Sequence, residues 1–346
     1  MAPAARCLVN DSFLPRTVVA PDASARSFHE ALERYEPTPL RSLPALATEL
    51  GLRSVRLKDE SARLGLPSFK VLGASWALEC ALRERPEIRT VVAASAGNHG
   101  RAVAHEASRR GLGCRIYLPA RSLRARREAI AAEGAEVVVV DGAYEDAVAV
   151  AATAGASPDT LELTDVGNAV TAHTVIDGYA TLFAEIADEG AADVVIVPVG
   201  VGALAAAAAR FGAAERALIV GVEPVSAACL TASLAGGQPV EVATPGTVMA
   251  GLDCARVSEA AWRSLREGIR GTVVVDDSEA SAAMHELAAL GLAIGDCGAA
   301  PLAALRTLAT EPGCAGLREA VRLGPRSRVV LVATEGLTSG GDLLAD

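Results

Sequence analysis

The chain has 346 residues, of which 51% are hydrophobic, so it can bury the core of one large domain or of two modest ones. Its net charge of -10 argues against nucleic acid or an anionic membrane surface as a partner. No stretch approaches the roughly 18 uninterrupted apolar residues of a membrane span, and the N-terminus lacks the apolar segment of a secretion signal. We therefore expect a cytoplasmic protein with no membrane partner.

The seven cysteines are scattered and odd in number, and no two of them form a Cys-x-x-Cys pair. This pattern fits a reducing compartment in which most of the cysteines are small core residues. The spacing of His, Cys and Asp gives no recognisable zinc or iron site, so we expect no metal.

Short β-branched runs alternate along the chain with longer Ala- and Leu-rich stretches of helical pattern. Strands are expected at 54–58, 90–94, 114–118, 136–140, 194–199, 218–222, 272–275 and 328–333. Helices are expected at 98–110, 123–132, 144–153, 171–187 and 279–290. Strands that are apolar throughout are typical of sheets buried on both faces. The pattern predicts an α/β protein with parallel sheets and crossover helices.

Evenly spaced units between residues 71 and 163 are expected to form a small α/β domain with a four-stranded sheet. Residues 1–70 and 164–346 would form the larger domain. Lys70 and Asp165 then lie at the two borders, in the cleft between domains where ligands commonly bind.

Only two lysines occur in the chain, Lys58 and Lys70, and arginine supplies the other basic side chains. A lysine amine can form a Schiff base with an aldehyde, whereas a guanidinium stays protonated and cannot. Lys70 follows Phe69 at the head of an apolar helical run, which makes it the candidate for such chemistry. For Lys58 by itself, chance survival is an equally good explanation.

Two glycine-rich turns each join a buried strand to a helix. The first is Ser95-Ala96-Gly97-Asn98-His99-Gly100, where free N–H groups of the helix suit a carboxylate or phosphate; a plain capped turn is the alternative. The second, Gly200-Val201-Gly202-Ala203-Leu204, suits a phosphate by the same physics. With Glu223 it also fits a dinucleotide fingerprint, which would indicate NAD but leaves Lys70 unexplained.

Small neutral side chains stand at two later junctions between elements. Cys297 opens a late helix and Thr334 ends the last strand. Each could hydrogen-bond a ligand, and each is equally a core residue or a cap.

Together these motifs resemble the fold type II (tryptophan-synthase-type) pyridoxal-phosphate enzymes. The strings Leu57-Lys58-Asp59-Glu60-Ser61, Gly178-Tyr179-Ala180-Thr181-Leu182 and Thr334-Glu335-Gly336 resemble the diaminopropionate ammonia-lyase branch, and Ser95 resembles the threonine and serine dehydratases. The resemblance covers roughly residues 38–340.

The resemblance implies a role for each motif residue. Lys70 would form the Schiff base with pyridoxal 5'-phosphate, Phe69 would pack near the ring, and Asn98 would bind its phenolate oxygen. The turn from Ser95 to His99 would hold the substrate carboxylate, and the Gly200 to Leu204 turn the phosphate. Thr334, or Cys297, would face the pyridine nitrogen and leave it unprotonated. A homodimer is also implied.

Two positions depart from the family pattern. The ammonia-lyase branch has Asp where this chain has Ser95, and that acid is thought to serve as a second base for D-amino acids. Cys229 stands where the dehydratases place an acidic metal ligand. Asp165 aligns with another acidic residue of the ammonia-lyase branch.

We expect a lyase that performs α,β-elimination on a small β-substituted amino acid and releases a 2-oxo acid and ammonia. The substrate is of the 2,3-diaminopropionate or the serine/threonine type. Lys70 would take the Cα proton as general base, and Asp165 would help the leaving group. The alternatives are β-replacement on the same fold, an NAD-binding oxidoreductase, and a binding protein without activity.

Overall fold

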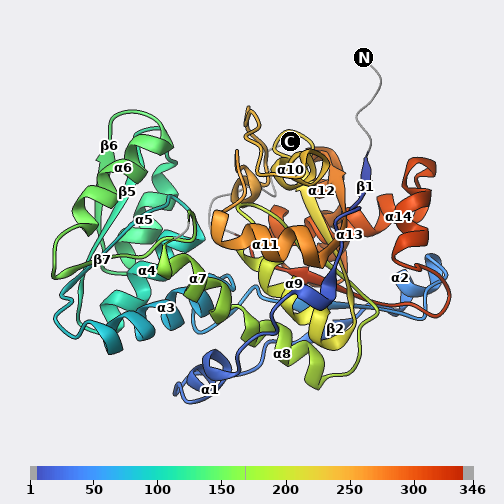
Figure 1. Ribbon diagram of the computed structural model, residues 1–346, viewed down its shortest axis with the longest axis horizontal. Helices are drawn as coiled ribbons and strands as arrows, with labels where there is room; N and C mark the ends of the chain where they lie inside the picture. Colours follow the sequence, from blue (N-terminus) through green and yellow to red (C-terminus); the bar gives the residue numbers. More distant parts are fainter. Residues whose placement is uncertain (1–5, 168, 338–346) are drawn as a thin grey trace.

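A computed structural model describes residues 6–167 and 169–337 and contains two β-sheets of different size (Figure 1). The smaller sheet has four parallel strands in the order β6 (Glu136–Val140), β5 (Gly113–Pro119), β4 (Thr90–Ala94) and β7 (Thr160–Glu162). Its helices are α3 (Lys70–Glu84), α4 (Asn98–Arg109), α5 (Arg124–Ala132) and α6 (Tyr144–Gly155). Helix α6 packs on one face of this sheet and α4 on the other, so both faces are covered.

The larger sheet has seven strands. In spatial order they are β1 (Cys7–Val9), β10 (Ile269–Val275), β9 (Leu218–Pro224), β8 (Val194–Pro198), β11 (Arg328–Ala333), β3 (Ser54–Asp59) and β2 (Leu40–Ser42). The five inner strands are parallel, as their apolar sequences predict, whereas β1 and β2 pair antiparallel at the two edges. The expected parallel sheets are therefore confirmed, and the two antiparallel edge strands are an addition that three-residue segments without a readable pattern did not predict.

Two groups of helices cover the faces of the larger sheet, and short helical segments complete the chain. One group contains α7 (Val170–Gly178), α8 (Ala180–Asp188), α9 (Ala203–Glu215) and α11 (Glu259–Gly268), and the other α2 (Pro44–Glu49), α12 (Asp277–Ala289), α13 (Asp296–Thr310) and α14 (Ala315–Ala320). The remaining segments are α1 (Ser24–Glu30), α10 (Cys229–Gly236), η1 (Pro15–Thr17), η2 (Ala250–Leu252) and η3 (Pro312–Cys314). No helix in the described part of the chain is long and apolar enough to cross a membrane.

The single helix expected over 171–187 is two helices, because the chain turns at Tyr179. A Cβ added to Gly178 would lie 2.5 Å from the carbonyl oxygen of Leu72, and one added to Gly73 would lie 2.6 Å from the ring of Tyr179. Helices α3 and α7 therefore approach closely through glycine, and the break turns the Tyr179 ring inward. The division into residues 71–163 and the remainder stays a prediction.

Lys58 lies in a buried ionic network between β3 and α8. Its Nζ donates to Glu185 Oε2 and to the carbonyl oxygen of Thr38, each at 2.6 Å. Arg63 donates to both Glu185 and Glu60, and all four charged side chains are 0–1% exposed. Lys58 therefore has a structural role and is not retained by chance, because the buried Glu185 carboxylate requires cationic partners.

Cys7 and Cys314 form a disulfide that ties β1 to the end of η3. The expectation that most cysteines are small core residues of a reducing compartment does not account for this pair. The other five are free, and Cys114, Cys229 and Cys297 are buried, as small core residues would be.

Candidate active site

Lys70 is the first residue of α3, where the chain passes the end of β11. The Phe69 N–H donates to the carbonyl oxygen of Thr334 at 3.3 Å, and an isolated bridge joins Ser68 to Glu335. This pairing fixes the start of α3 against the carboxyl end of the larger sheet. The Lys70 Nζ lies 5.4 Å from the Phe69 ring centroid and 5.9 Å from that of Tyr179.

The Lys70 amine forms an ion pair with Asp165, which follows the small sheet in the chain. Lys70 Nζ donates to Asp165 Oδ2 at 2.8 Å, and the two side chains are 22% and 13% exposed. Burial alone would lower the pKa of Lys70, but the adjacent carboxylate outweighs burial and holds that pKa above its ordinary value. Burial would raise the pKa of Asp165, but the adjacent His99 and then Lys70 instead hold that pKa low. The two groups predicted to lie at the domain borders are therefore in direct contact.

His99 and Tyr179 complete the surroundings of this ion pair. His99 Nε2 lies 3.0 Å from the Leu163 carbonyl oxygen, and its Nδ1 lies 3.8 Å from Asp165 Oδ2. Burial lowers the pKa of His99, which keeps the imidazole neutral. Apart from its electrostatic contact with Lys70, the buried Tyr179 hydroxyl has no partner among the described residues. The His99 Nδ1 atom and the Tyr179 hydroxyl thus face the ion pair and are available to a ligand.

The first glycine turn connects β4 to α4. The Ser95 hydroxyl accepts from the Gly97 N–H at 3.2 Å, so this side chain is engaged inside the turn. A Cβ on Gly100 would lie 2.4 Å from the Ser95 carbonyl oxygen, which explains the glycine. Because α4 begins at Asn98, the N–H groups of its first turn, including that of His99, have no partner within the helix. Ala96 lies between Ser95 and Gly97 in the same turn, and the whole turn suits an anion.

Asn98 reaches across to the larger sheet. Its side-chain amide donates to the Glu335 carboxylate, which follows β11. Burial raises the pKa of Glu335. A ligand bound to Asn98 would replace or share this contact.

The second glycine turn connects β8 to α9. Gly202 has φ of +92°, a left-handed conformation that favours glycine, and a Cβ on Gly200 would lie 2.7 Å from the Gly251 carbonyl oxygen. Helix α9 begins at Ala203, so the N–H groups of Ala203 and Leu204 have no intrahelical partner. Together with Val201, these residues form a loop of backbone donors that fits a phosphate.

Glu223, the acid of the dinucleotide fingerprint, is committed elsewhere. Its carboxylate accepts from the N–H groups of Leu230 and Thr231 at 2.6 and 2.8 Å and from the Thr231 hydroxyl. Burial raises its pKa to about 7. Both oxygens are used at the start of α10, so Glu223 does not present a free carboxylate to a ribose.

Thr334 and Cys297 lie at the end of β11 and the start of α13. The Thr334 hydroxyl is buried and has no hydrogen-bond partner in the described ranges. The Cys297 thiol is near Glu335, and burial followed by that carboxylate raises its pKa. Thr334 therefore has the hydroxyl that a ring nitrogen could use, while Cys297 already has a partner.

Several residues near the site were missed by sequence reasoning. Tyr144 donates to the Ala94 carbonyl oxygen at 3.2 Å, and burial, followed by Asp165, raises the pKa of its hydroxyl. Burial raises the pKa of the Cys254 thiol to about 12, and this thiol lies near Gly200. Tyr179 had a signal, since it belongs to a string that resembles the family, whereas Tyr144 and Cys254 had none.

A lysine at the head of a helix, an anion-binding turn, and a phosphate-sized loop on an α/β fold are the features of a pyridoxal-phosphate-dependent enzyme. The chain belongs to this family, pyridoxal-phosphate-dependent enzymes, whose pattern matches residues 31–335. The residues described above fit the cofactor: Lys70 for its aldehyde, residues 200–204 for its phosphate, and the unpartnered Thr334 hydroxyl for its ring nitrogen.

Two groups of relatives are similar to most of this chain. The diaminopropionate ammonia-lyase of Salmonella typhimurium is 32% identical over 90% of this chain and 88% of its own length. A biosynthetic L-threonine dehydratase of Corynebacterium glutamicum is 33% identical over 80% of this chain and 65% of its own length. The crystal structure of Escherichia coli diaminopropionate ammonia-lyase, with an aminoacrylate-cofactor intermediate, has a TM-score of 0.88, is 28% identical, and covers 96% of this chain and 94% of that one. Another structure of that enzyme contains D-serine.

These matches confirm the fold type II architecture, pyridoxal phosphate as cofactor, and a lyase of the ammonia-lyase and dehydratase group. They overturn the NAD alternative, in agreement with the engaged carboxylate of Glu223. Within residues 6–167 and 169–337, no three His, Cys, Asp or Glu side chains are grouped as metal ligands.

Proposed function

We propose that the protein eliminates ammonia from L-2,3-diaminopropionate and that Asp165 selects this substrate. The main observation in support is that the Asp165 carboxylate lies 2.8 Å from the Lys70 amine and that the pKa of Asp165 is held low. At neutral pH an ionised carboxylate attracts the β-ammonium group of diaminopropionate, whereas the neutral hydroxyl of serine gains less from it. The diaminopropionate ammonia-lyase relatives support the same choice.

Proton transfer at Cα is assigned to Lys70. When bound, pyridoxal phosphate supplies an electron-withdrawing ring that makes the substrate Cα–H acidic. The Lys70 amine takes this proton as general base, and the Cβ–N bond breaks as the Cα–Cβ double bond forms. The leaving amine departs as ammonia, and hydrolysis of the resulting enamine gives pyruvate and a second ammonia.

Asp165 acts as an anion rather than as a proton donor. Its low pKa keeps it ionised at neutral pH, so it has no proton to give. It stabilises the lysine ammonium that forms when Lys70 takes the Cα proton, and it orients the β-ammonium group. Asp165 therefore helps elimination by keeping the leaving group oriented and in its ammonium form, from which neutral ammonia departs.

The other site residues are assigned to binding. The turn from Ser95 through Ala96, Gly97 and Asn98 to His99 holds the substrate carboxylate with backbone N–H groups. Phe69 would pack near the cofactor ring, Asn98 would bind its phenolate oxygen, and Thr334, with Cys297 as the second candidate, would face its nitrogen. The Gly200, Val201, Gly202, Ala203 and Leu204 turn holds the phosphate. The substrate is a small amino acid whose α-carboxylate and β-group lie between these turns.

The preference for the L enantiomer follows from Ser95. This hydroxyl accepts from the Gly97 N–H and is not a carboxylate, so the chain lacks the second base that the ammonia-lyase branch places there. Lys70 is then the one base at Cα, and it reaches one face of the substrate.

The domain division, the oligomeric state and the cellular compartment belong to the same proposal. The small domain spans residues 71–163, the large domain residues 1–70 and 164–346, and the protein is a homodimer of the cytoplasm. The two separate sheets support this division of the chain, and the Cys7–Cys314 disulfide is the feature that a reducing compartment would oppose.

A substrate panel tests the function. Both enantiomers of 2,3-diaminopropionate, serine and threonine are supplied to the holoenzyme, and 2-oxo acid and ammonia are measured. L-2,3-diaminopropionate should have the highest kcat/KM and release two ammonia molecules per pyruvate. Asp165→Asn should lower kcat/KM about tenfold or more for diaminopropionate and less for serine, since hydrogen bonds to charged groups contribute about 1.5–3 kcal/mol. Release of 2-oxo acid only from serine or threonine, or turnover that requires an added nucleophile, would contradict the proposal.

A further inference from the structure

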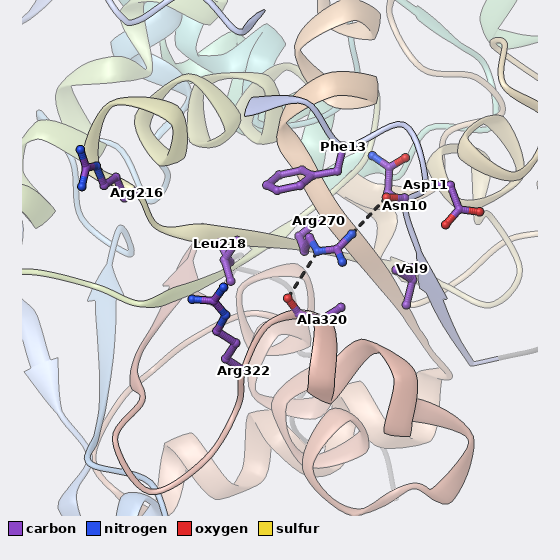
Figure 2. Close-up of a pocket in the computed structure, with 9 residues that line it drawn as sticks. All are labelled: Val9, Asn10, Asp11, Phe13, Arg216, Leu218, Arg270, Ala320 and Arg322. Atoms are coloured by element: carbon purple, nitrogen blue, oxygen red, sulfur yellow. Dashed lines mark hydrogen bonds between the residues drawn. The ribbon is translucent and has the colours of Figure 1, made fainter. Parts of the chain in front are cut away.

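A cavity of about 560 Å³ lies in the larger sheet's domain, away from the active site. Its walls are the segment that follows β1, the first residues of β9 and β10, and the end of α14. Three arginines line it, Arg216, Arg270 and Arg322, and Figure 2 shows them around Leu218. We propose that this cavity is a binding site for a small polyanion, a compound with two or more phosphate or carboxylate charges.

The charge in the cavity is not balanced by the protein. No carboxylate of the described chain lies within ion-pair distance of any of the three guanidinium groups, although the chain as a whole carries a net charge of -10. Asp11 is the single acidic residue among the lining residues. Three uncompensated guanidinium groups favour an anion of matching charge, because their planar N–H donors bind phosphate or carboxylate in pairs.

Arg270 is held in place by the walls. Its guanidinium donates to the carbonyl oxygens of Asn10 and Ala320, and its Cζ lies 5.2 Å from the Phe13 ring centroid. Arg270 thus joins the β1 segment to the end of α14. Arg216 and Arg322 are exposed, and neither side chain has a hydrogen-bond or ion-pair partner among the described residues. They are free to contact a ligand.

Backbone strain at the same two arginines is an independent observation. Arg216 and Arg322 have φ of +60° and +55°, the left-handed conformation that favours glycine at the end of a helix. Only one other non-glycine residue of the described chain, Leu64, has a positive φ. Two of the three strained positions therefore place a guanidinium at one cavity, and retained strain of this kind is typical of functional positions.

The cavity is distinct from the active site. Leu218 and Arg270 lie at the amino ends of parallel strands, whereas the active-site turns follow the carboxyl ends of strands. Helix α9 spans the distance, since it begins at the second glycine turn and is followed directly by Arg216 at its carboxyl end. The Cys7–Cys314 disulfide ties β1 to the segment before α14, so it links two of the cavity's walls.

The test is calorimetric titration of the holoenzyme, in which the cofactor phosphate already fills the 200–204 turn. Pyrophosphate and citrate are the two probes. One of them should bind at a 1:1 ratio, and the tighter one shows whether phosphate or carboxylate is preferred. The Arg216→Gly/Arg322→Gly variant should bind about tenfold or more weakly, as expected when charge-assisted contacts are lost.

The glycine substitutions also separate binding from folding. Because glycine adopts a positive φ without strain, the melting temperature of the double variant should not be lower than that of the native protein. Arg34→Gly, in an exposed loop after α1, is the control for charge and should bind like the native protein. Absence of binding by both probes, or equal affinity in the native and double-variant proteins, would overturn the proposal.

Discussion

Lys70 and Asp165 each set the protonation state of the other. The carboxylate holds the pKa of Lys70 above its ordinary value, while the amine holds the pKa of Asp165 low. Sequence placed both residues at the borders of a small domain but gave no distance between them. Their contact depends on how β4, β7 and α3 are arranged, which is a property of tertiary packing.

Asp165→Asn should shift the pH dependence of cofactor capture. Schiff-base formation requires the neutral Lys70 amine. Without Asp165 the largest cause that raises the pKa of Lys70 is lost, while burial still lowers that pKa. The apoprotein variant should therefore reach half of its maximal rate of reconstitution at a lower pH than the native apoprotein. Absorbance on addition of pyridoxal phosphate follows the rate.

The matched control is Asp188→Asn, an exposed acid of α8. It should reconstitute with the native pH profile. An unchanged midpoint pH in Asp165→Asn would show that the Asp165 carboxylate does not control the pKa of the Lys70 amine.

At the scale of elements, β3 and α8 are joined by charge as well as by apolar contact. Glu185 accepts from Lys58 Nζ at 2.6 Å and from Arg63 at 2.6 and 2.7 Å, and Tyr35 also donates to it. Burial would raise the pKa of Glu185, but the hydrogen bonds and charge of Arg63 hold it low. This contribution to stability is present above the unfolded-state pKa of the acid and is lost as pH falls through the lower folded-state value.

Glu185→Gln should lower the free energy of unfolding by about 3–5 kcal/mol, because removal of one partner leaves buried charge uncompensated. Denaturant unfolding at pH 7 measures the change. Glu33→Gln, an exposed acid, should change the free energy by less than about 0.5 kcal/mol. A loss in Glu185→Gln as small as in the control would contradict a structural role for the network.

Sequence predicted the inner strands well and the edges poorly. The strands 90–94 and 328–333 have the expected bounds, because strands buried on both faces are apolar throughout. The edge strand 136–140 is also matched, although it is only partly buried, because it contains four consecutive valines. Strands β1, β2 and β7 have three residues each, which is too few for a periodic pattern. The glycine turns were readable because they are local, whereas the positions of Tyr144 and Cys254 depend on contacts between distant segments.

For the whole molecule, the disulfide joins cysteines 307 residues apart. Such a pair has no spacing signature, so sequence could not reveal it. Native protein unfolded without reductant should expose five alkylatable thiols, and reduced protein seven. Reduction should lower the free energy of unfolding by about 2–5 kcal/mol. Seven reactive thiols before reduction would show that the bond does not form in the protein as isolated.

The most direct test of the proposed chemistry uses the scarcity of lysine. Borohydride reduction of the holoenzyme would lock a Schiff base into a stable secondary amine, and peptide mapping would locate the modified residue. The tag should lie on Lys70 and not on the fully buried Lys58, and Lys70→Arg should show neither the tag nor the visible absorbance of the cofactor. A tag on Lys58 or on the N-terminal amine, or 2-oxo acid production by Lys70→Arg at the native rate, would contradict the assignment of Lys70.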